Sequence, residues 1–303
     1  MLQPAGRGES LGKALMRRTW WLAAGLALLA ARGAAQTDYF SPGSVRRFAD
    51  YLYSEQQFAR AAGEYQRYLL IADSAQGRDT IEFRIAQCLR RAKQQEQALV
   101  HYERAAGSNP DAEWRDRLAY EVAFSWLEVG KPAQSIASAQ SHTPAVPGYR
   151  GRFRNLTALN YLYLKQWGAA QAALRGDATQ GDTIAQQLET FALEGIRLPR
   201  RSPALAGVMS AVIPGAGKAY AGRIPDALFS LATIGLTGWQ AYEGFRRDSL
   251  KSVSGWIYGT LAVGLYVGDI WGSVVAALQH NERAEDALLS RIGDLRVKLE
   301  PAQ

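Results

Sequence analysis

The chain has 303 residues, of which 48% are apolar, and its only cysteine is Cys88. This composition excludes a small protein held together by disulfides and a disordered chain, and it suffices for two modest domains or one domain with a membrane anchor. The formal charge of +7 lies mostly in residues 1–35, which hold five basic residues and one acidic residue. The charge therefore predicts no nucleic-acid partner.

Residues 1–35 are typical of a secretory signal peptide. Arg17 and Arg18 precede a 13-residue apolar run, and small residues follow it up to Ala35. We therefore expect cleavage after Ala35 and export of the rest of the chain. The alternative is an uncleaved anchor helix, but 13 apolar residues would span a membrane poorly, because a membrane-crossing helix needs about 20.

A weak internal period runs from Ser44 to about Arg175, within a repeat region predicted over residues 40–198. Small residues recur at spacings of 37, 37 and 35, namely Ala61, Ala98, Ser135 and Ala170. The best copy, residues 79–110, resembles the tetratricopeptide repeat, in which two antiparallel helices cross at small residues. The resemblance implies an all-α helical solenoid, and the amphipathic residues 183–198 predict a capping helix at its end.

In the tetratricopeptide family the first helix of each repeat lines a concave groove for an extended peptide or a partner helix. The matching positions in this chain are Arg46, Asp50, Tyr53, Phe83, Gln87, Arg90, Tyr120, Phe124, Leu127, Arg152, Asn155, Leu159 and Tyr163. Aromatic side chains interleaved with arginine suit a partner-binding surface. The alternative is that residues such as Phe83, Phe124 and Leu159 simply pack against neighbouring helices.

The composition changes after the solenoid. Residues 199–223 predict a linker rich in proline, glycine and basic residues. Residues 252–279 carry Asp269 as their only formal charge and would span about 42 Å as a helix, enough to cross a bilayer. Residues 224–245 are a weaker candidate, and together the two segments predict a two-helix transmembrane hairpin over residues 224–280. A buried hairpin in a soluble domain is the alternative, but little chain remains to cover it.

The linker ends in the sequence IPGAGKAYAGR, residues 213–223. It is not a phosphate-binding loop, because the glycine spacing is wrong and Ala219 stands where a metal-binding hydroxyl is needed. The segment resembles the Pro-Gly-x-Gly-x-x-Tyr-x-Gly signature that opens two-helix membrane domains of bacterial proteins, often after tetratricopeptide repeats. That resemblance implies an architecture more than an activity. The membrane-domain motif comprises Pro214, Gly215, Gly217, Lys218, Tyr220, Gly222, Arg223, Asp226, Gly268, Asp269 and Gly272.

Two residues depart from that signature, and both are charged. Lys218 stands where the family has glutamine, and Asp269 stands where asparagine is expected. A carboxylate inside an apolar helix is costly unless it faces a partner or water. We therefore expect Asp269 to pair with Lys218 or Arg223; the alternative is that the long helix places Asp269 at a membrane interface, where it needs no partner.

Residues 281–303 predict an amphipathic tail helix that docks on the membrane domain or on the repeats. Its apolar stripe is Ala284, Leu288, Ile292, Leu295 and Leu299.

The sequence holds no recognisable catalytic motif. Its three histidines, His101, His142 and His280, lie in different segments, so neither a metal, nor a cofactor, nor an enzymatic activity is expected. The sequence predicts a non-enzymatic scaffold of the bacterial cell envelope, membrane-anchored with its repeats in the periplasm, which binds other envelope proteins or peptides. The bilayer would be bound through the hairpin, and the oligomeric state stays open. The alternative is a membrane-embedded transport or insertion module that the repeats regulate.

Overall fold

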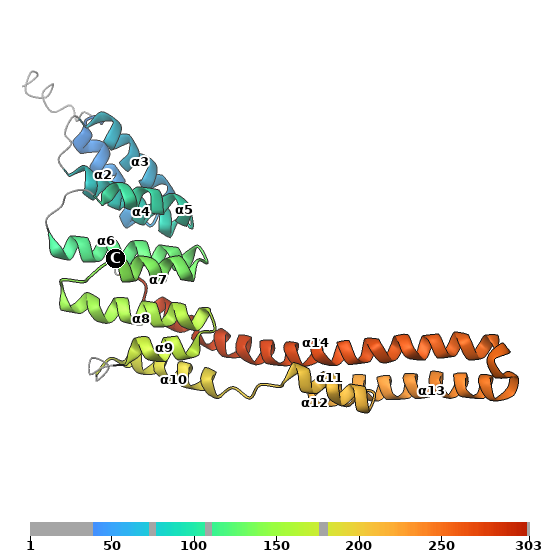
Figure 1. The fold of residues 1–303 in the computed structure, drawn as a ribbon. Helices are drawn as coiled ribbons and strands as arrows, with labels where there is room; N and C mark the ends of the chain where they lie inside the picture. The colour runs from blue at the N-terminus through green and yellow to red at the C-terminus, as the bar shows by residue number, and fades with distance from the viewer. Residues whose placement is uncertain (1–38, 73–76, 107–110, 176–180, 302–303) are drawn as a thin grey trace, which may run out of the picture. The chain divides into compact units, whose positions relative to one another are not determined.

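The computed structural model describes residues 39–72, 77–106, 111–175 and 181–301. The predicted signal peptide, residues 1–35, lies outside the described residues. Within them the regular structure consists of thirteen α-helices, α2 to α14, and one 3-10 turn, without strands (Figure 1). The all-α prediction is therefore confirmed for the part of the chain that the structure describes.

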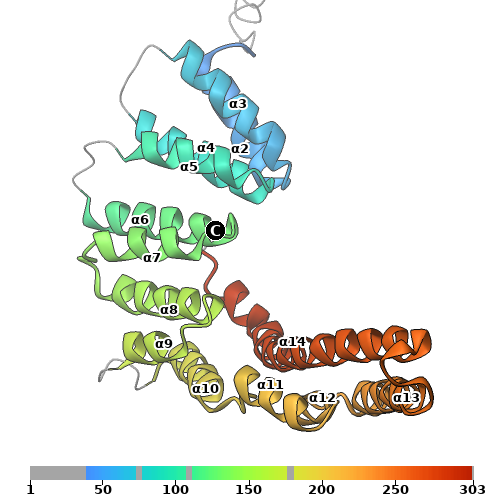
Figure 2. The same ribbon diagram turned by 45° about the vertical axis from the view of Figure 1, so that its right-hand side comes forward.

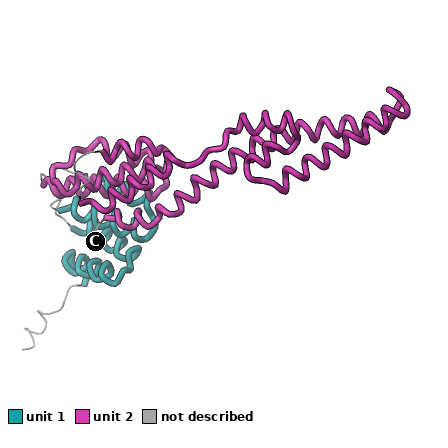
Figure 3. The backbone as a smooth tube through the Cα atoms, turned by 90° about the horizontal axis from the view of Figure 1, so that it is seen from below, with its two compact units in different colours: residues 1–105 teal, residues 106–303 magenta. Residues whose placement is uncertain are grey.

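The chain divides into two compact units, residues 1–105 and 106–303 (Figure 3). In the first unit, α2 (Pro42–Ser54) pairs with α3 (Phe58–Ile71), and α4 (Arg78–Arg91) pairs with α5 (Gln95–Ala105). Ala61 and Ala98 are fully buried, as helix crossings that admit only small residues require. The predicted period of helix pairs thus holds in this unit.

The second unit begins with five helices of the repeat region. They are α6 (Ala112–Glu128), α7 (Pro132–Ser141), α8 (Pro147–Tyr163), α9 (Trp167–Leu174) and α10 (Thr183–Arg197). Ser135 and Ala170 are fully buried. Asp182 starts α10 by accepting hydrogen bonds from the backbone N–H groups of Ile184 and Ala185. The helix predicted over residues 183–198 is therefore present, and it packs on α8 and α9.

The region predicted as a linker with the membrane signature, residues 199–223, contains two helices, which the sequence did not predict. They are α11 (Pro203–Val212) and the short α12 (Ala216–Tyr220). Residues 198–202 form no helix and separate α10 from α11. Pro203 occupies the first turn of α11, and Ser202 caps that turn by accepting a hydrogen bond from Leu205 N. Proline is well suited to this position because its missing N–H would have no partner there.

A helical hairpin follows, formed by α13 (Ile224–Asp248), the turn η2 (Ser249–Lys251) and α14 (Val253–Lys298). The first part of α14 runs alongside α13 (Figure 2). Among the described residues, α14 is the one helix long and apolar enough to cross a membrane. Gln240 and Glu243 reduce the apolar character of α13, so a hairpin of two such helices stays a prediction.

The boundary predicted between the hairpin and the tail, at residues 280 and 281, is absent. Helix α14 continues for 46 residues without interruption, because the polar stretch around residue 281 contains no glycine or proline and consists largely of good helix formers. Its last part packs on the repeats: Leu288, Ile292, Leu295 and Leu299 belong to a hydrophobic core shared with α6, α8 and α10. The structure thus selects the repeats as the docking surface of the tail.

Candidate functional site

The glycines of the membrane-domain motif allow a very close approach of backbones. Gly215 has a φ of 84° and precedes α12, and a Cβ atom at this position would overlap the carbonyl oxygen of Ala227 in α13. A Cβ atom on Gly217 would overlap the carbonyl oxygen of Ala206 in α11. Only glycine therefore fits at these two positions, and α12 is wedged between α11, α13 and α14.

The remaining motif residues fix the ends of these short elements. Pro214 lies two residues after the last residue of α11, and Gly222, with a φ of 84°, ends the turn after α12. Tyr220 accepts a hydrogen bond at its hydroxyl from Ser202 N over 3.1 Å. Arg223 pairs with Asp226 in the first turn of α13, at 2.6 Å. These contacts give the motif a structural role.

Asp269 is paired as predicted, and its partner is Lys218. Lys218 Nζ lies 2.9 Å from Asp269 Oδ1 and donates to Ser230 Oγ over 2.6 Å, while Gly215 N donates to Asp269 Oδ2 over 2.7 Å. Asp269 is only 2% exposed, so the alternative of an unpartnered carboxylate at an interface is wrong. The pair joins α12, α13 and α14 through one polar network.

Gly264, Gly268 and Gly272 recur every four residues along α14, but only one of them is closely packed against a neighbouring element. Gly272 lies against the aliphatic chain of Lys218, whereas nothing lies within 4 Å of a Cβ atom placed on Gly264 or Gly268. A hydrogen bond of 2.7 Å between the hydroxyls of Ser210 and Ser273 ties α11 to α14 one turn beyond Asp269. Of the glycines at 264, 268 and 272, Gly272 alone is closely packed.

Most residues predicted to line the repeat groove are buried. Those with at most 6% of their surface exposed are Phe83, Gln87, Arg90, Tyr120, Phe124, Leu127, Asn155 and Leu159. Phe83 packs edge-on against Tyr102, with ring centroids 5.5 Å apart. For these side chains the prediction of an open groove is wrong, because aromatic and aliphatic residues at these positions fill the spaces between helices.

The second unit covers its own groove positions with α14. Tyr120 donates its hydroxyl hydrogen to the backbone oxygen of Leu299 over 2.6 Å. Leu159 shares the core with the tail helix, and Tyr163 is partly buried against the same cluster. Arg152 lies over the ring of Tyr120, 4.4 Å from its centroid. The sequence did not reveal this arrangement, since it joins segments that lie far apart along the chain.

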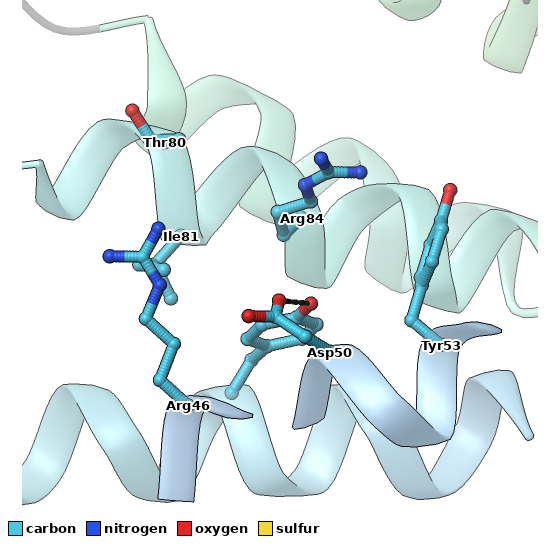
Figure 4. Close-up of a pocket in the computed structure, with 7 residues that line it drawn as sticks. Arg46, Asp50, Tyr53, Thr80, Ile81 and Arg84 are labelled. Atoms are coloured by element: carbon cyan, nitrogen blue, oxygen red, sulfur yellow. Dashed lines mark hydrogen bonds between the residues drawn. The ribbon is translucent and has the colours of Figure 1, made fainter. Parts of the chain in front are cut away.

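In the first unit, the predicted groove residues Arg46, Asp50 and Tyr53 do line an open pocket, of about 390 Å³ (Figure 4). The other lining residues are Tyr65, Thr80, Ile81 and Arg84. Arg46 comes from α2 and Arg84 from α4, one turn before the predicted Gln87. Sequence reasoning missed Arg84, although its position on the same helix as Phe83 and Gln87 was a usable signal.

The electrostatics of this pocket favour an anion. Asp50 Oδ1 accepts a hydrogen bond from the Tyr65 hydroxyl over 2.5 Å, and burial followed by this bond raises the pKa of Tyr65 above its usual value, which keeps it a donor. The Arg84 guanidinium lies 5.3 Å from the centroid of the Tyr53 ring. Two guanidinium groups therefore face one carboxylate that already has a partner, and the pocket carries a net positive charge.

The histidines form separate polar pairs and no common centre. His101 Nδ1 lies 2.6 Å from Glu82 Oε2, and His142 Nε2 lies 2.7 Å from Asp116 Oδ1. Although burial acts to raise it, the pKa of Asp116 lies below its ordinary value, because Val146 N, His142 and Ala145 N donate hydrogen bonds to the carboxylate. The described residues contain no group of three histidine, cysteine or acidic side chains placed to hold a metal.

No protein-family model matches the chain, and no curated protein is significantly similar to it. The tetratricopeptide resemblance and the membrane signature therefore rest on the residues and contacts described above.

Proposed function

We propose that the chain is a non-enzymatic, membrane-anchored scaffold of the bacterial cell envelope, which binds acidic peptides or protein segments in the pocket of its first unit. The observation that carries the proposal is the dual character of α14. In its first part, only 22% of the residues of the most apolar 18-residue stretch are buried. Its last part is packed into the repeat core. One continuous helix thus links a lipid-compatible surface to a helical array.

The surface of the hairpin supports a membrane location. Large apolar side chains remain exposed along both helices, among them Leu228, Phe229, Leu231, Leu236 and Trp239 on α13 and Trp256, Ile257, Leu261, Val263, Val267 and Trp271 on α14. Continuous apolar surface of this kind is rare on water-soluble monomers. Tryptophan near a turn that carries Arg246, Arg247 and Lys251 is typical of a membrane interface.

The buried Lys218–Asp269 pair does not require a transport function. The protein itself supplies contacts to both groups: Lys218 donates to Ser230 Oγ, Gly215 N donates to Asp269 Oδ2, and Asp269 Oδ1 has the Lys218 ammonium as its one polar contact among the described residues. A charge pair enclosed in this way fixes the packing of neighbouring helices, which is a sufficient role for it. The scaffold proposal therefore accounts for the one strongly polar feature of the hairpin.

The pocket between α2 and α4 supports an acidic partner. Its volume suits one or two side chains of an extended peptide, and its two arginines can donate charge-assisted hydrogen bonds to carboxylates. Arg46 forms no ion pair or hydrogen bond with another described residue. Binding of this type weakens as salt concentration rises, because the arginines are not deeply buried.

A peptide-binding experiment tests the proposal. A random peptide library selected on the purified full chain should yield peptides rich in aspartate and glutamate. Arg46→Ala and Arg84→Ala should each weaken their binding about tenfold or more, since a hydrogen bond to a charged group contributes about 1.5 to 3 kcal/mol. Arg47→Ala is the matched control, because Arg47 neighbours Arg46 but does not line the pocket. Equal binding by all three variants would refute the assignment of the pocket.

A further inference from the structure

The last part of α14 lies on the second unit as a bound amphipathic helix. Leu288, Ile292, Leu295 and Leu299 are each at most 4% exposed, and their spacing of four, three and four residues places them on one stripe. The same core cluster contains side chains of α6, α8 and α10. The contact therefore has the form of a helix seated against a helical array.

The charges beside this stripe match those of the surface that receives it. Arg291 makes a two-pronged contact with Glu194, at 2.7 and 3.4 Å, and Arg296 lies 3.7 Å from Glu128. Lys298 Nζ donates to Gln187 over 3.2 Å. These contacts are partly exposed, so each adds little stability, but together they fix the register of the helix.

The buried hydroxyl of Tyr120 forms a hydrogen bond with the C-terminal end of the helix. Tyr120 is 1% exposed and donates to the carbonyl oxygen of Leu299, one of the terminal carbonyls that an α-helix leaves without a partner. Burial raises the pKa of Tyr120 to about 12, so the hydroxyl remains a donor at neutral pH. The receiving surface thus has an apolar centre, a rim whose acidic residues and Lys165 each pair with opposite charges on the tail, and a defined end position.

We propose that this face of α6, α8 and α10 is a receptor for an amphipathic helix, and that residues 284–299 are its resident ligand. The tail closes the face to other helices. This inference goes beyond the proposed function, which uses the arginine pocket of the first unit. Because the tail is attached to the same chain, its effective concentration at the face is of the order of millimolar, and a free helix of the same sequence competes poorly.

A peptide added in trans tests this proposal on the full chain in detergent. The probe is a fluorescent peptide of residues 281–303, and its binding is measured by anisotropy. Ile292→Asp in the chain places a charge within the apolar stripe and should weaken the binding of the tail to the face. The variant should then bind the unaltered peptide about a hundredfold or more tightly than the original chain does. Val297→Asp is the matched control, because Val297 is 70% exposed, and it should bind the peptide no better than the original chain.

Each of three outcomes would overturn the proposal. If the original chain binds the peptide as tightly as the Ile292→Asp chain, the tail does not close the face. If the Ile292→Asp chain keeps its helical circular dichroism but does not bind the peptide, the face is not a receptor. If that variant loses the cooperative melting of the array, the tail is an integral part of the core.

A charge swap checks the register independently. A chain that combines Ile292→Asp, which releases the tail, with Glu194→Arg should prefer a peptide carrying Arg291→Glu over the unaltered peptide. All these variants leave the arginine pocket of the first unit intact. Binding of acidic peptides should therefore be unchanged, so failure of this proposal and failure of the proposed function are distinguishable.

Discussion

The polar pair inside the hairpin provides a mutational test whose magnitude follows from the structure. Asp269→Leu would leave the Lys218 ammonium without its counter-charge and the Gly215 N–H without its acceptor. Removing one partner of a buried ion pair costs about 3 to 5 kcal/mol. Because the Lys218 side chain is 19% exposed, we expect a value near the lower end, about 3 kcal/mol.

Three further variants separate charge from packing. Asp269→Asn keeps an acceptor for Gly215 N and should cost less than the leucine variant, about 1 to 3 kcal/mol. Lys218→Met combined with Asp269→Leu removes both charges and should recover much of the loss. Asp226→Leu breaks an exposed pair, whose side chains are 43% and 46% exposed, and should cost at most about 1 kcal/mol.

The assay is unfolding of the full chain in detergent, followed by helical circular dichroism. A buried pair is contradicted if Asp269→Leu lowers the free energy of unfolding no more than Asp226→Leu does. It is contradicted equally if the double variant shows no coupling between Lys218 and Asp269, because the pair would then not be a buried interaction.

Three other changes have defined outcomes. Gly217→Ala should destabilise the hairpin by about 1 to 3 kcal/mol, because it overpacks the contact with α11, whereas Gly238→Ala, in open space within α13, should be neutral or stabilising in the same melt. Ala98→Trp should lower the melting temperature far more than Glu96→Trp, since Ala98 is fully buried and Glu96 is exposed; equal shifts would contradict the helix crossing. Asp116→Asn should be destabilising at neutral pH, and its deficit should shrink as pH falls below about 4, because the stability from a lowered carboxylate pKa is present above the unfolded pKa and is lost as pH falls through the folded pKa; a deficit that does not shrink at all on acidification would contradict this.

The sequence predicted those features that depend on local pattern. The helix pairs follow from small residues at regular spacings, such as Ala61 and Ala98. The Lys218–Asp269 pair follows from the cost of a charge in an apolar helix and the scarcity of nearby cations. Both inferences rest on a strong physical penalty, which leaves each of these positions few acceptable neighbours.

Contacts between distant segments that no such physical penalty requires could not be predicted. The bond between Tyr120 and Leu299 spans 179 positions of the chain, and no local pattern indicates which surface receives the tail. The groove residues illustrate the same limit, since aromatic residues such as Phe124 suit both an open surface and a helix interface.

Quenching of tryptophan fluorescence by brominated lipids tests the membrane anchor most directly. In single-tryptophan variants of the full chain reconstituted in vesicles, Trp256 and Trp271, which are 57% and 70% exposed on the hairpin, should be strongly quenched. Trp126, which lies in α6 beside Lys131, should not. Absence of quenching at Trp256 and Trp271, or equal quenching at Trp126, would contradict a scaffold anchored through its hairpin.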